Sequence, residues 1–227
     1  MTVTALVSGG KDSIYSAYLA ETQGWPVDEL VTLRPADPQS LLFHTPNLHL
    51  VALQAGSWGK GHRSVVVGGY GEEAETIGLT TALRGSSGPV VAGAIGSSFQ
   101  WARLNRVCFE LGRPLYTPLW GKDPIRVVRE EVAAGLDIRF VHLSAEGLPA
   151  DLIGQALDAG MIARLEAIDR AGPGVHLAGE GGEYETLVLD APFFAQRLEL
   201  EETEVVRERD VTRLIVRKAR LVRKAVH

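Results

Sequence analysis

Near its N-terminus the chain reads Ser8-Gly9-Gly10-Lys11-Asp12-Ser13, a run of small and polar residues between two apolar segments. Residues 3–7, just before it, are apolar except for one threonine and predict a buried parallel strand. Residues 14–20, just after it, are rich in alanine, leucine and tyrosine and predict a helix. The polar run is therefore expected to link the end of a strand to the start of a helix.

A junction of this kind is suited to binding phosphate. The first turn of a helix leaves backbone N–H groups unpaired and carries partial positive charge. Gly9 and Gly10 have no Cβ, so the backbone can adopt positive φ there and come close to a ligand. Ser8 and Ser13 add hydroxyl groups, and Lys11 adds a full positive charge. A plain turn with capping side chains is the alternative, but so many polar and glycine positions together favour an anion site.

Asp12 is the exception, because a carboxylate beside a phosphate repels it. A divalent cation between the two groups relieves that repulsion, as does use of the side chain as a helix cap. We favour the cation. The spacing differs from the Walker loop and from the dinucleotide Gly-x-Gly-x-x-Gly loop. It resembles the pyrophosphate loop Ser-Gly-Gly-x-Asp-Ser of the N-type ATP pyrophosphatases, which adenylate an acceptor oxygen and let a nitrogen or sulfur nucleophile displace AMP.

Composition and charge limit the classes of protein that the chain can belong to. The 227 residues are 45% hydrophobic and 22% charged, which is typical of an ordinary globular protein with one good core or two modest ones. A net charge of −5 argues against a general nucleic-acid surface. No apolar run is long enough to cross a bilayer, and no export signal is recognisable, so we expect the cytoplasm and no membrane contact.

Cys108 is the only cysteine of the chain. A single cysteine excludes an intrachain disulfide and a multi-cysteine metal site. It also weighs against sulfur transfer, for which a pair of cysteines commonly carries the sulfur. We therefore expect Cys108 to be a small apolar residue on the buried side of a helix.

Strands and helices alternate through about residue 120. Strands are expected at 29–33, 65–67 and 89–95, and helices at 13–23, 72–83 and 98–112. This alternation predicts a doubly wound parallel sheet with helices on both faces. The loop after the second strand should lie at the ligand-binding edge. His44 lies in that loop, before Thr45 and Pro46 at the expected start of a helix, and either contacts the nucleotide or is an ordinary loop residue.

Two arginines on the helix expected at 98–112 are further candidates for the site. Arg103 and Arg106 are three residues apart and so share a face of this helix. Guanidinium groups donate paired hydrogen bonds to polyphosphate or carboxylate. Exposed helix arginines are usually only solvated, and the expected position near the strand end alone favours nucleotide contact.

The pattern changes after residue 120. Helices are expected at 125–134 and 161–170, and a strand at 138–143. Residues 198–207 and 212–222 alternate apolar and charged side chains around a turn, which predicts a half-exposed antiparallel pair. We therefore expect a nucleotide-binding domain at 1–120 and a smaller α+β substrate-binding domain at 121–227.

The densest polar cluster of the sequence lies in this second part and reads Gly179-Glu180-Gly181-Gly182-Glu183-Tyr184-Glu185-Thr186. Three carboxylates so close together repel one another unless a cation or a cationic substrate compensates them. In an extended strand Glu183 and Glu185 point to one face, with Tyr184 on the other, so both carboxylates are expected in one cleft. An exposed acidic turn is the alternative.

The motifs together resemble the diphthine–ammonia ligase family. The resemblance runs from about residue 3 to about 195 and depends on the pyrophosphate loop, on 43–47, on 93–95, on Gln100 to Cys108, on 118–120 and on 179–186. It implies an adenine nucleotide alpha hydrolase-like fold and the last step of diphthamide synthesis, in which diphthine on translation elongation factor 2 is adenylated by ATP and amidated by ammonium. The glycine-rich segment 54–73 matches no pattern of the family.

Our hypothesis assigns roles to single residues. Ser8, Gly9, Gly10, Lys11 and Ser13 would hold the β and γ phosphates, with Asp12 and Glu180 on Mg²⁺. The nucleotide site would also include His44, Arg103, Arg106, Gly181 and Gly182. The catalytic residues would be Lys11, Asp12, Glu183 and Glu185, the last two binding a cationic part of the acceptor or the incoming ammonium.

Other functions stay open from the sequence. An enzyme of the same superfamily could amidate or thiolate a different acceptor, and a nucleotide-sensing module could bind ATP or AMP without chemistry. No cysteine is placed to hydrolyse glutamine, so free ammonium is the expected nitrogen source unless a partner protein supplies ammonia. A homodimer is compatible with all of these readings.

Overall fold

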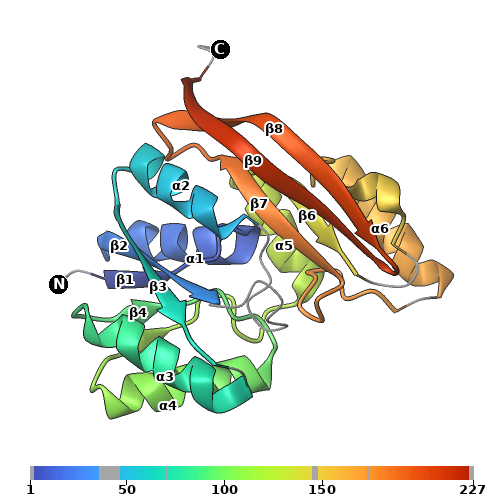
Figure 1. The fold of residues 1–227 in the computed structure, drawn as a ribbon. Coiled ribbons are helices and arrows are strands. Elements are labelled where there is room, and N and C mark those ends of the chain that lie inside the picture. Colours follow the sequence, from blue (N-terminus) through green and yellow to red (C-terminus); the bar gives the residue numbers. More distant parts are fainter. Residues whose placement is uncertain (1–2, 36–46, 70, 145–147, 173, 225–227) are drawn as a thin grey trace.

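The computed structural model describes residues 3–35, 47–69, 71–144, 148–172 and 174–224. Two sheets make up the molecule (Figure 1). The first half of the chain builds a parallel sheet with helices on both faces, and the second half builds an antiparallel sheet beside it. The expected α/β architecture with a second, α+β part is confirmed.

The parallel sheet contains β1 (Val3–Leu6), β2 (Val27–Pro35), β3 (Gly61–Val67), β4 (Val90–Val91) and β5 (Leu115–Tyr116). Its strand order is β3-β2-β1-β4-β5, and every neighbouring pair is parallel. The chain thus winds outward from β1 first to one side and then to the other. Ligands of such sheets bind beyond the carboxyl ends of the strands where the winding reverses, which is the end of β1 here.

Four helices cover the two faces of this sheet (Figure 1). α1 (Lys11–Thr22) and α2 (Val51–Trp58) lie on one face, with the short 3₁₀ helix η1 (Leu48–Leu50) directly before α2. α3 (Gly71–Arg84) and α4 (Ser98–Glu110) lie on the other, over a small core that includes Cys108. Cys108 is 1% exposed, which confirms it as a buried helix residue. No helix in the described ranges is both long and apolar enough to cross a membrane.

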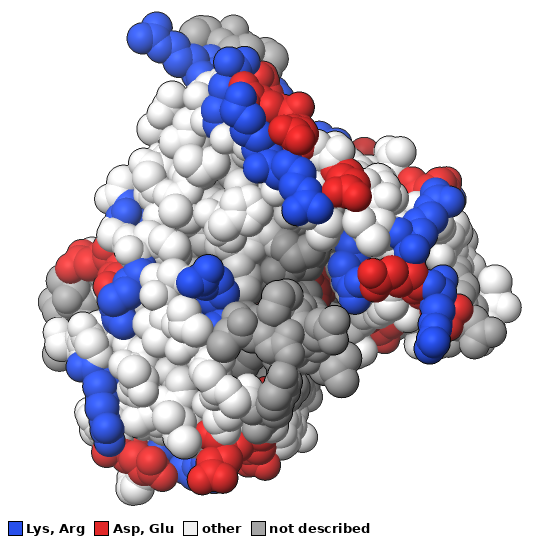
Figure 2. Space-filling view, viewed as in Figure 1, with Lys and Arg blue, Asp and Glu red and all other residues white. Residues whose placement is uncertain are grey.

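The antiparallel sheet contains β6 (Asp137–Leu143), β7 (Tyr184–Asp190), β8 (Gln196–Glu208) and β9 (Val211–Arg223) in the order β7-β6-β9-β8. The hairpin β8–β9 confirms the predicted antiparallel pair. Its exposed face carries paired charges such as Arg220 with Glu199 and Arg217 with Glu204. Figure 2 shows basic and acidic side chains gathered along this hairpin. The remaining helices are α5 (Pro124–Ala133), the 3₁₀ helix η2 (Ala150–Leu152) and α6 (Ala159–Ala171).

One large hydrophobic core joins the two sheets. It includes Ile14 and Leu30 from the first sheet and its helices, and Phe140 and Leu187 from the second sheet. α5 connects the two parts along the chain and packs against both α1 and α6. Because the core is continuous, the division of the chain at residue 120 stays a prediction.

Several boundaries differ from the sequence expectation. The strand expected at 89–95 is only Val90–Val91, because the chain beyond it leaves the sheet to pass against the start of α1, as described below. β5 was not expected, since two residues give no periodic signal. β3 begins at Gly61, inside the glycine-rich segment. His44, Thr45 and Pro46 lie outside the described residues, and the first described helical turn after them is η1.

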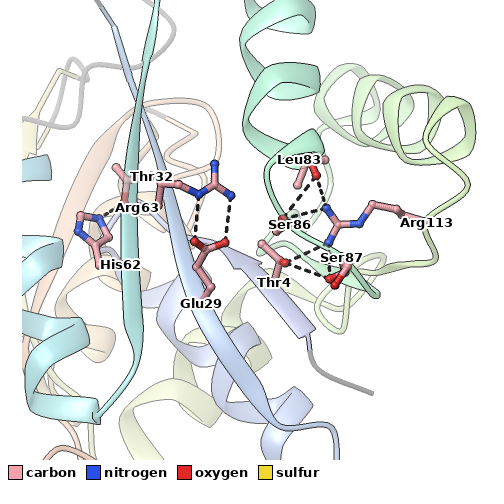
Figure 3. Close-up of polar contacts among 9 residues, drawn as sticks. All are labelled: Thr4, Glu29, Thr32, His62, Arg63, Leu83, Ser86, Ser87 and Arg113. Atoms are coloured by element: carbon pink, nitrogen blue, oxygen red, sulfur yellow. Dashed lines mark hydrogen bonds and ion pairs between the residues drawn. The ribbon is translucent and has the colours of Figure 1, made fainter.

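Polar side chains bind one another at the amino ends of the parallel strands, far from the carboxyl end of β1 (Figure 3). Arg113 is 9% exposed and donates to five acceptors on Thr4, Leu83, Ser86, Ser87 and Gly88. On the neighbouring strands Arg63 makes a two-bond pair with Glu29, both distances being 2.9 Å. These contacts lie at the sheet edge away from the phosphate loop, so we read them as structural.

Candidate functional site

A cleft of about 580 Å³ opens at the carboxyl end of β1. Its lining includes Ser8, Gly10, Lys11, Asp12 and Ser13 of the predicted phosphate loop. It also includes residues 92–94 after β4 and residues 178–182 and 184–186 of the acidic motif. The two motifs singled out in the sequence therefore face one shared cavity, although they are separated by more than half of the chain.

The phosphate loop has a tightly bonded backbone. Gly9 has a φ of +84°, a conformation that favours glycine. The Ser13 hydroxyl donates to the Gly10 carbonyl at 3.0 Å and accepts from the Ser8 N–H at 3.2 Å. Gly10 stands at the N-cap of α1 and has no side chain to cap the helix. The loop thus ends with the amino terminus of a helix at the cleft, the arrangement that suits an anion.

Lys11 lies differently from the sequence expectation. Its side chain is only 1% exposed, and its Nζ is 2.6 Å from Asp12 Oδ1 and 3.6 Å from Glu131 Oε2. The Tyr184 ring centroid is 5.9 Å from the same nitrogen. The ammonium group is held by protein carboxylates in the interior, so this conformation does not support direct contact between Lys11 and the β and γ phosphates.

Burial and neighbouring charges shift the pKa values of Lys11 and Glu131. Burial alone would lower the pKa of Lys11, but Asp12 and Glu131 outweigh it and raise that pKa, so the ammonium stays charged. Burial raises the pKa of Glu131 well above its ordinary value, although Lys11 opposes the effect. Asp12, whose side chain is 30% exposed, is thus the main anionic partner of Lys11.

Glu131 was missed from the sequence. It lies on α5 and is 0% exposed. A signal was available, because Glu131 follows the buried Val127 and Val128 at helical spacing and so falls on the apolar face of this helix. A carboxylate on such a face needs a buried partner, and the partner turned out to be Lys11.

The two residues assigned to Mg²⁺ both line the cleft, but each also has a protein partner. Asp12 accepts from Lys11, and Glu180 Oε1 accepts from the Ile95 N–H at 2.7 Å. Within the described ranges no group of three or more metal-binding side chains occurs. Mg²⁺ is commonly held by one or two carboxylates together with substrate phosphates, so this pair of oxygen donors fits an ion that arrives with a nucleotide.

The carboxylates of the acidic motif point in different directions. Glu183 precedes β7, and its Oε1 accepts from the His176 N–H at 3.1 Å, so the side chain folds back on its own turn. Glu183 is absent from the described cleft lining, whereas Glu185 and Tyr184 are part of it. The structure therefore does not support the expectation that both carboxylates point into one cleft.

Glu185 is the carboxylate of the motif with the most unusual environment. In the strand register it lies opposite His142 of β6, which in turn pairs with Arg213 of β9. Its Oε2 is buried without a hydrogen-bond partner among the described residues. Burial raises the pKa of Glu185 to about 8, and Arg213 only partly opposes the shift. A cation that enters the cleft would favour the ionised form of Glu185 and compensate its charge.

The two arginines of α4 lie away from the described lining of the cleft. Arg103 forms an ion pair with Glu75 of α3 and stacks over Phe99, 4.2 Å from the ring centroid. Arg106 donates to the Thr76 hydroxyl at 3.2 Å. These partners join α4 to α3 and do not support the predicted nucleotide contacts. His44, the remaining nucleotide candidate, lies outside the described residues.

Known proteins resemble the chain along almost its whole length. A diphthine–ammonia ligase of Homo sapiens is 30% identical, over 91% of this chain and 85% of its own length. The Danio rerio protein of the same name is 30% identical and matches over 89% of its length, and the Schizosaccharomyces pombe protein is 31% identical but matches over only 37% of its length.

A solved structure gives a more distant match. It is titled as a predicted subunit of tRNA methyltransferase from Methanocaldococcus jannaschii, with 16% identity, a TM-score of 0.43 and coverage of 74% of this chain and 87% of that one. Two family models match directly. The diphthamide synthase N-terminal domain covers residues 1–114, and the diphthamide synthase C-terminal domain covers residues 123–222. Together with the cleft that the two matched regions share, these matches show that the chain belongs to the diphthamide synthase family.

Proposed function

We propose that this protein is a ligase that amidates diphthine on translation elongation factor 2 with ammonium, at the expense of ATP. The products would be diphthamide, AMP and pyrophosphate. The proposal is supported by relatives named diphthine–ammonia ligase that match over 91% of the chain. Because the proposed acceptor is a translation factor, the proposed place of action is the cytoplasm.

The observation that carries the proposal is the shared cleft. A reaction that joins an ATP phosphate to a carboxylate of another molecule needs a phosphate-binding loop and an acceptor-binding surface on one cavity. Here the loop at 8–13 and the motif at 179–186 line the same cavity. Two independent sites on separate faces would not support this chemistry.

The chemistry has two displacements. A carboxylate oxygen of diphthine attacks the α-phosphorus of ATP, and pyrophosphate leaves with its electron pair. Ammonia, formed when ammonium gives a proton to solvent, then attacks the acyl carbon. The C–O bond to AMP breaks, AMP leaves with the electron pair, and the nitrogen releases a second proton to solvent as the amide forms. The protein contributes positioning and stabilisation of the departing pyrophosphate, for which the start of α1 is suited.

Mg²⁺ bound by Asp12 and Glu180 would neutralise part of the phosphate charge during the first displacement. Glu185 is the residue that we assign to the cationic partner, either the trimethylammonio group of diphthine or the incoming ammonium. Its buried, unpaired Oε2 and its place in the cleft lining support this assignment. Glu183, which turns back to His176, keeps a supporting role in the shape of the motif.

The test is a reconstituted reaction with elongation factor 2 that carries diphthine, ATP, Mg²⁺ and ammonium. We expect one AMP and one pyrophosphate to form for each amide. Mass spectrometry of the acceptor measures how much amide has formed. Glu185→Gln should lower turnover, while Glu199→Gln on the exposed hairpin should not. Formation of ADP, or an unchanged acceptor in the presence of ATP consumption, would overturn the proposed activity.

A further inference from the structure

The carbonyl group of Gly9 is held from two sides. It accepts from the side-chain amide of Gln54 on α2 at 3.0 Å and from the backbone N–H of Val188 on β7 at 3.0 Å. The same amide nitrogen of Gln54 also donates to the Val188 carbonyl at 2.8 Å. Gln54 is 0% exposed and does not line the cleft. One buried amide therefore joins the phosphate loop to a strand of the second sheet.

The orientation of the Gly9 carbonyl also sets the direction of the Gly10 N–H. A trans peptide is planar, and its C=O and N–H point in opposite directions. The peptide between Gly9 and Gly10 has its oxygen on Gln54 and Val188, so the Gly10 N–H points away from them. Gly10 belongs to the cleft lining. The bonds to Gly9 thus set the orientation of a donor at the phosphate end of the cavity.

Thr186 binds the backbone of Lys11, the residue after Gly10. Its hydroxyl accepts from the Lys11 N–H at 3.1 Å and so satisfies one of the unpaired amides in the first turn of α1. A helix is usually capped by its own preceding residue, but Gly10 cannot do this. The cap comes instead from a residue 175 positions away on β7.

These contacts leave little room for a side chain at either glycine. A Cβ on Gly9 would lie 2.9 Å from Gln54 Oε1, and a Cβ on Gly10 would lie 3.1 Å from the Thr186 carbonyl. Gln54 Oε1 is itself buried without a hydrogen-bond partner among the described residues, which is a cost. The two hydrogen bonds of the Gln54 amide nitrogen offset the free energy lost at the unpaired oxygen, and no apolar side chain could make them.

We propose that Gln54 and Thr186 are positioning residues for nucleotide binding, which hold the phosphate loop in its binding shape from α2 and β7. This inference rests on the proposed use of ATP at the loop. It assigns to the second sheet a part in nucleotide affinity in addition to its part in acceptor binding. Gln54 acts only through the loop, because it does not reach the cleft.

The experiment measures binding of a non-hydrolysable ATP analogue with Mg²⁺ by calorimetry to the full chain and its variants. Gln54→Leu and Thr186→Val should each weaken binding by about tenfold or more, the effect of one lost hydrogen bond to an ordered loop. Thr186→Ser keeps the hydroxyl and should stay within about threefold of the parent protein. In turnover assays Gln54→Leu should raise the KM for ATP and leave kcat at saturating ATP nearly unchanged.

The matched control is Asn47→Leu. Asn47 is another buried amide with two backbone bonds, to Leu214 and Val216 of β9, at 2.9 Å each, and it does not touch the loop. It should lower the melting temperature about as much as Gln54→Leu and leave analogue affinity unchanged. Parent-like affinity in a folded Gln54→Leu protein, or an equal loss in Asn47→Leu, would overturn the positioning role. Failure of the parent protein itself to bind the analogue would instead refute the proposed use of ATP.

Discussion

Lys11 is a buried cation. Its neighbours Asp12 and Glu131 come from α1 and α5, so the ion pair ties the phosphate loop to the helix that connects the two sheets. A buried charge is tolerated only with partners of opposite charge or with hydrogen bonds. Lys11, which the sequence suggests as a phosphate ligand, is in the structure the counter-ion of Asp12, a residue of the cleft lining.

Replacing this cation should destabilise the whole protein. We expect Lys11→Met to lower the free energy of unfolding by on the order of 3 kcal/mol, because it leaves Asp12 and Glu131 without their partner. The double variant Lys11→Met with Glu131→Met should recover part of that loss, since apolar side chains replace the buried pair. Urea denaturation measures both. If the double variant is less stable than the single one, Glu131 is not a partner of Lys11.

Glu185 gives a prediction on pH. Its pKa is about 8 in the folded protein against an ordinary value of 4.5, so between these values the folded state holds a proton that the unfolded state has released. The stability that depends on the protonated carboxyl is therefore complete below pH 4.5 and is lost as pH rises through 8.

Glu185→Gln cannot ionise and should remove this dependence. Denaturation of both proteins from pH 5 to about pH 9 should show the variant gaining stability relative to the parent as pH rises. A difference between the two proteins that is constant over this range would mean that Glu185 is already ionised at the lower pH.

The start of α1 is surrounded by other segments of the chain. The loop after β4 passes so close that a Cβ on Gly93 would lie 2.7 Å from the backbone carbon of Asp12 and 2.8 Å from the Ser13 nitrogen. β7 and α2 contact the same turn from other sides. This crowding explains why β4 ends early, because the chain must leave the sheet to make room for the helix.

Gly93→Ala is the corresponding test. The added methyl cannot fit without moving the backbone of α1 or of the loop, so we expect weaker binding of the ATP analogue together with a lower melting temperature. Gly56→Ala is the control, because Gly56 lies in α2 with no atom within 4 Å of the position of its Cβ. That change should be neutral or stabilise by up to about 1 kcal/mol. Unchanged affinity in Gly93→Ala would show that the loop can shift freely.

The two sheets depend on each other. They share one core, and the phosphate loop of the first is bonded to β7 of the second. The family models divide the chain between residues 114 and 123, close to the predicted boundary at 120. A boundary in sequence families does not require that each part folds alone.

A fragment of residues 1–120 tests this dependence. It lacks Glu131, Thr186 and Val188, and it exposes the core surface that the second sheet covers. We expect it to show no cooperative thermal transition and no measurable affinity for the ATP analogue. The fragment 121–227 added in trans serves as the control and should restore some binding. Affinity equal to that of the full chain in 1–120 alone would show that the first sheet is self-sufficient.

The local elements could be predicted from the sequence because their signals are local. The strand before Ser8, the helix after it and the hairpin β8–β9 each follow from the periodicity of neighbouring residues. The alternation of strands and helices then predicts the doubly wound sheet. The acidic motif was found because three carboxylates in one short segment need an explanation. These features decided the fold class and the two sides of the cleft.

The orientation of side chains at the site depended on segments that meet only in the folded chain. Nothing near Lys11 in the sequence shows that Glu131 will enclose it, and nothing near Gln54 shows that its amide will hold Gly9. Arg103 turned to Glu75, and Glu183 to His176, because these partners came within reach when the elements packed. The candidate residues came from the sequence, since composition and periodicity are properties of the chain. Only the tertiary structure decided which of them face the cleft, because the burial of a charge depends on partners far away along the chain.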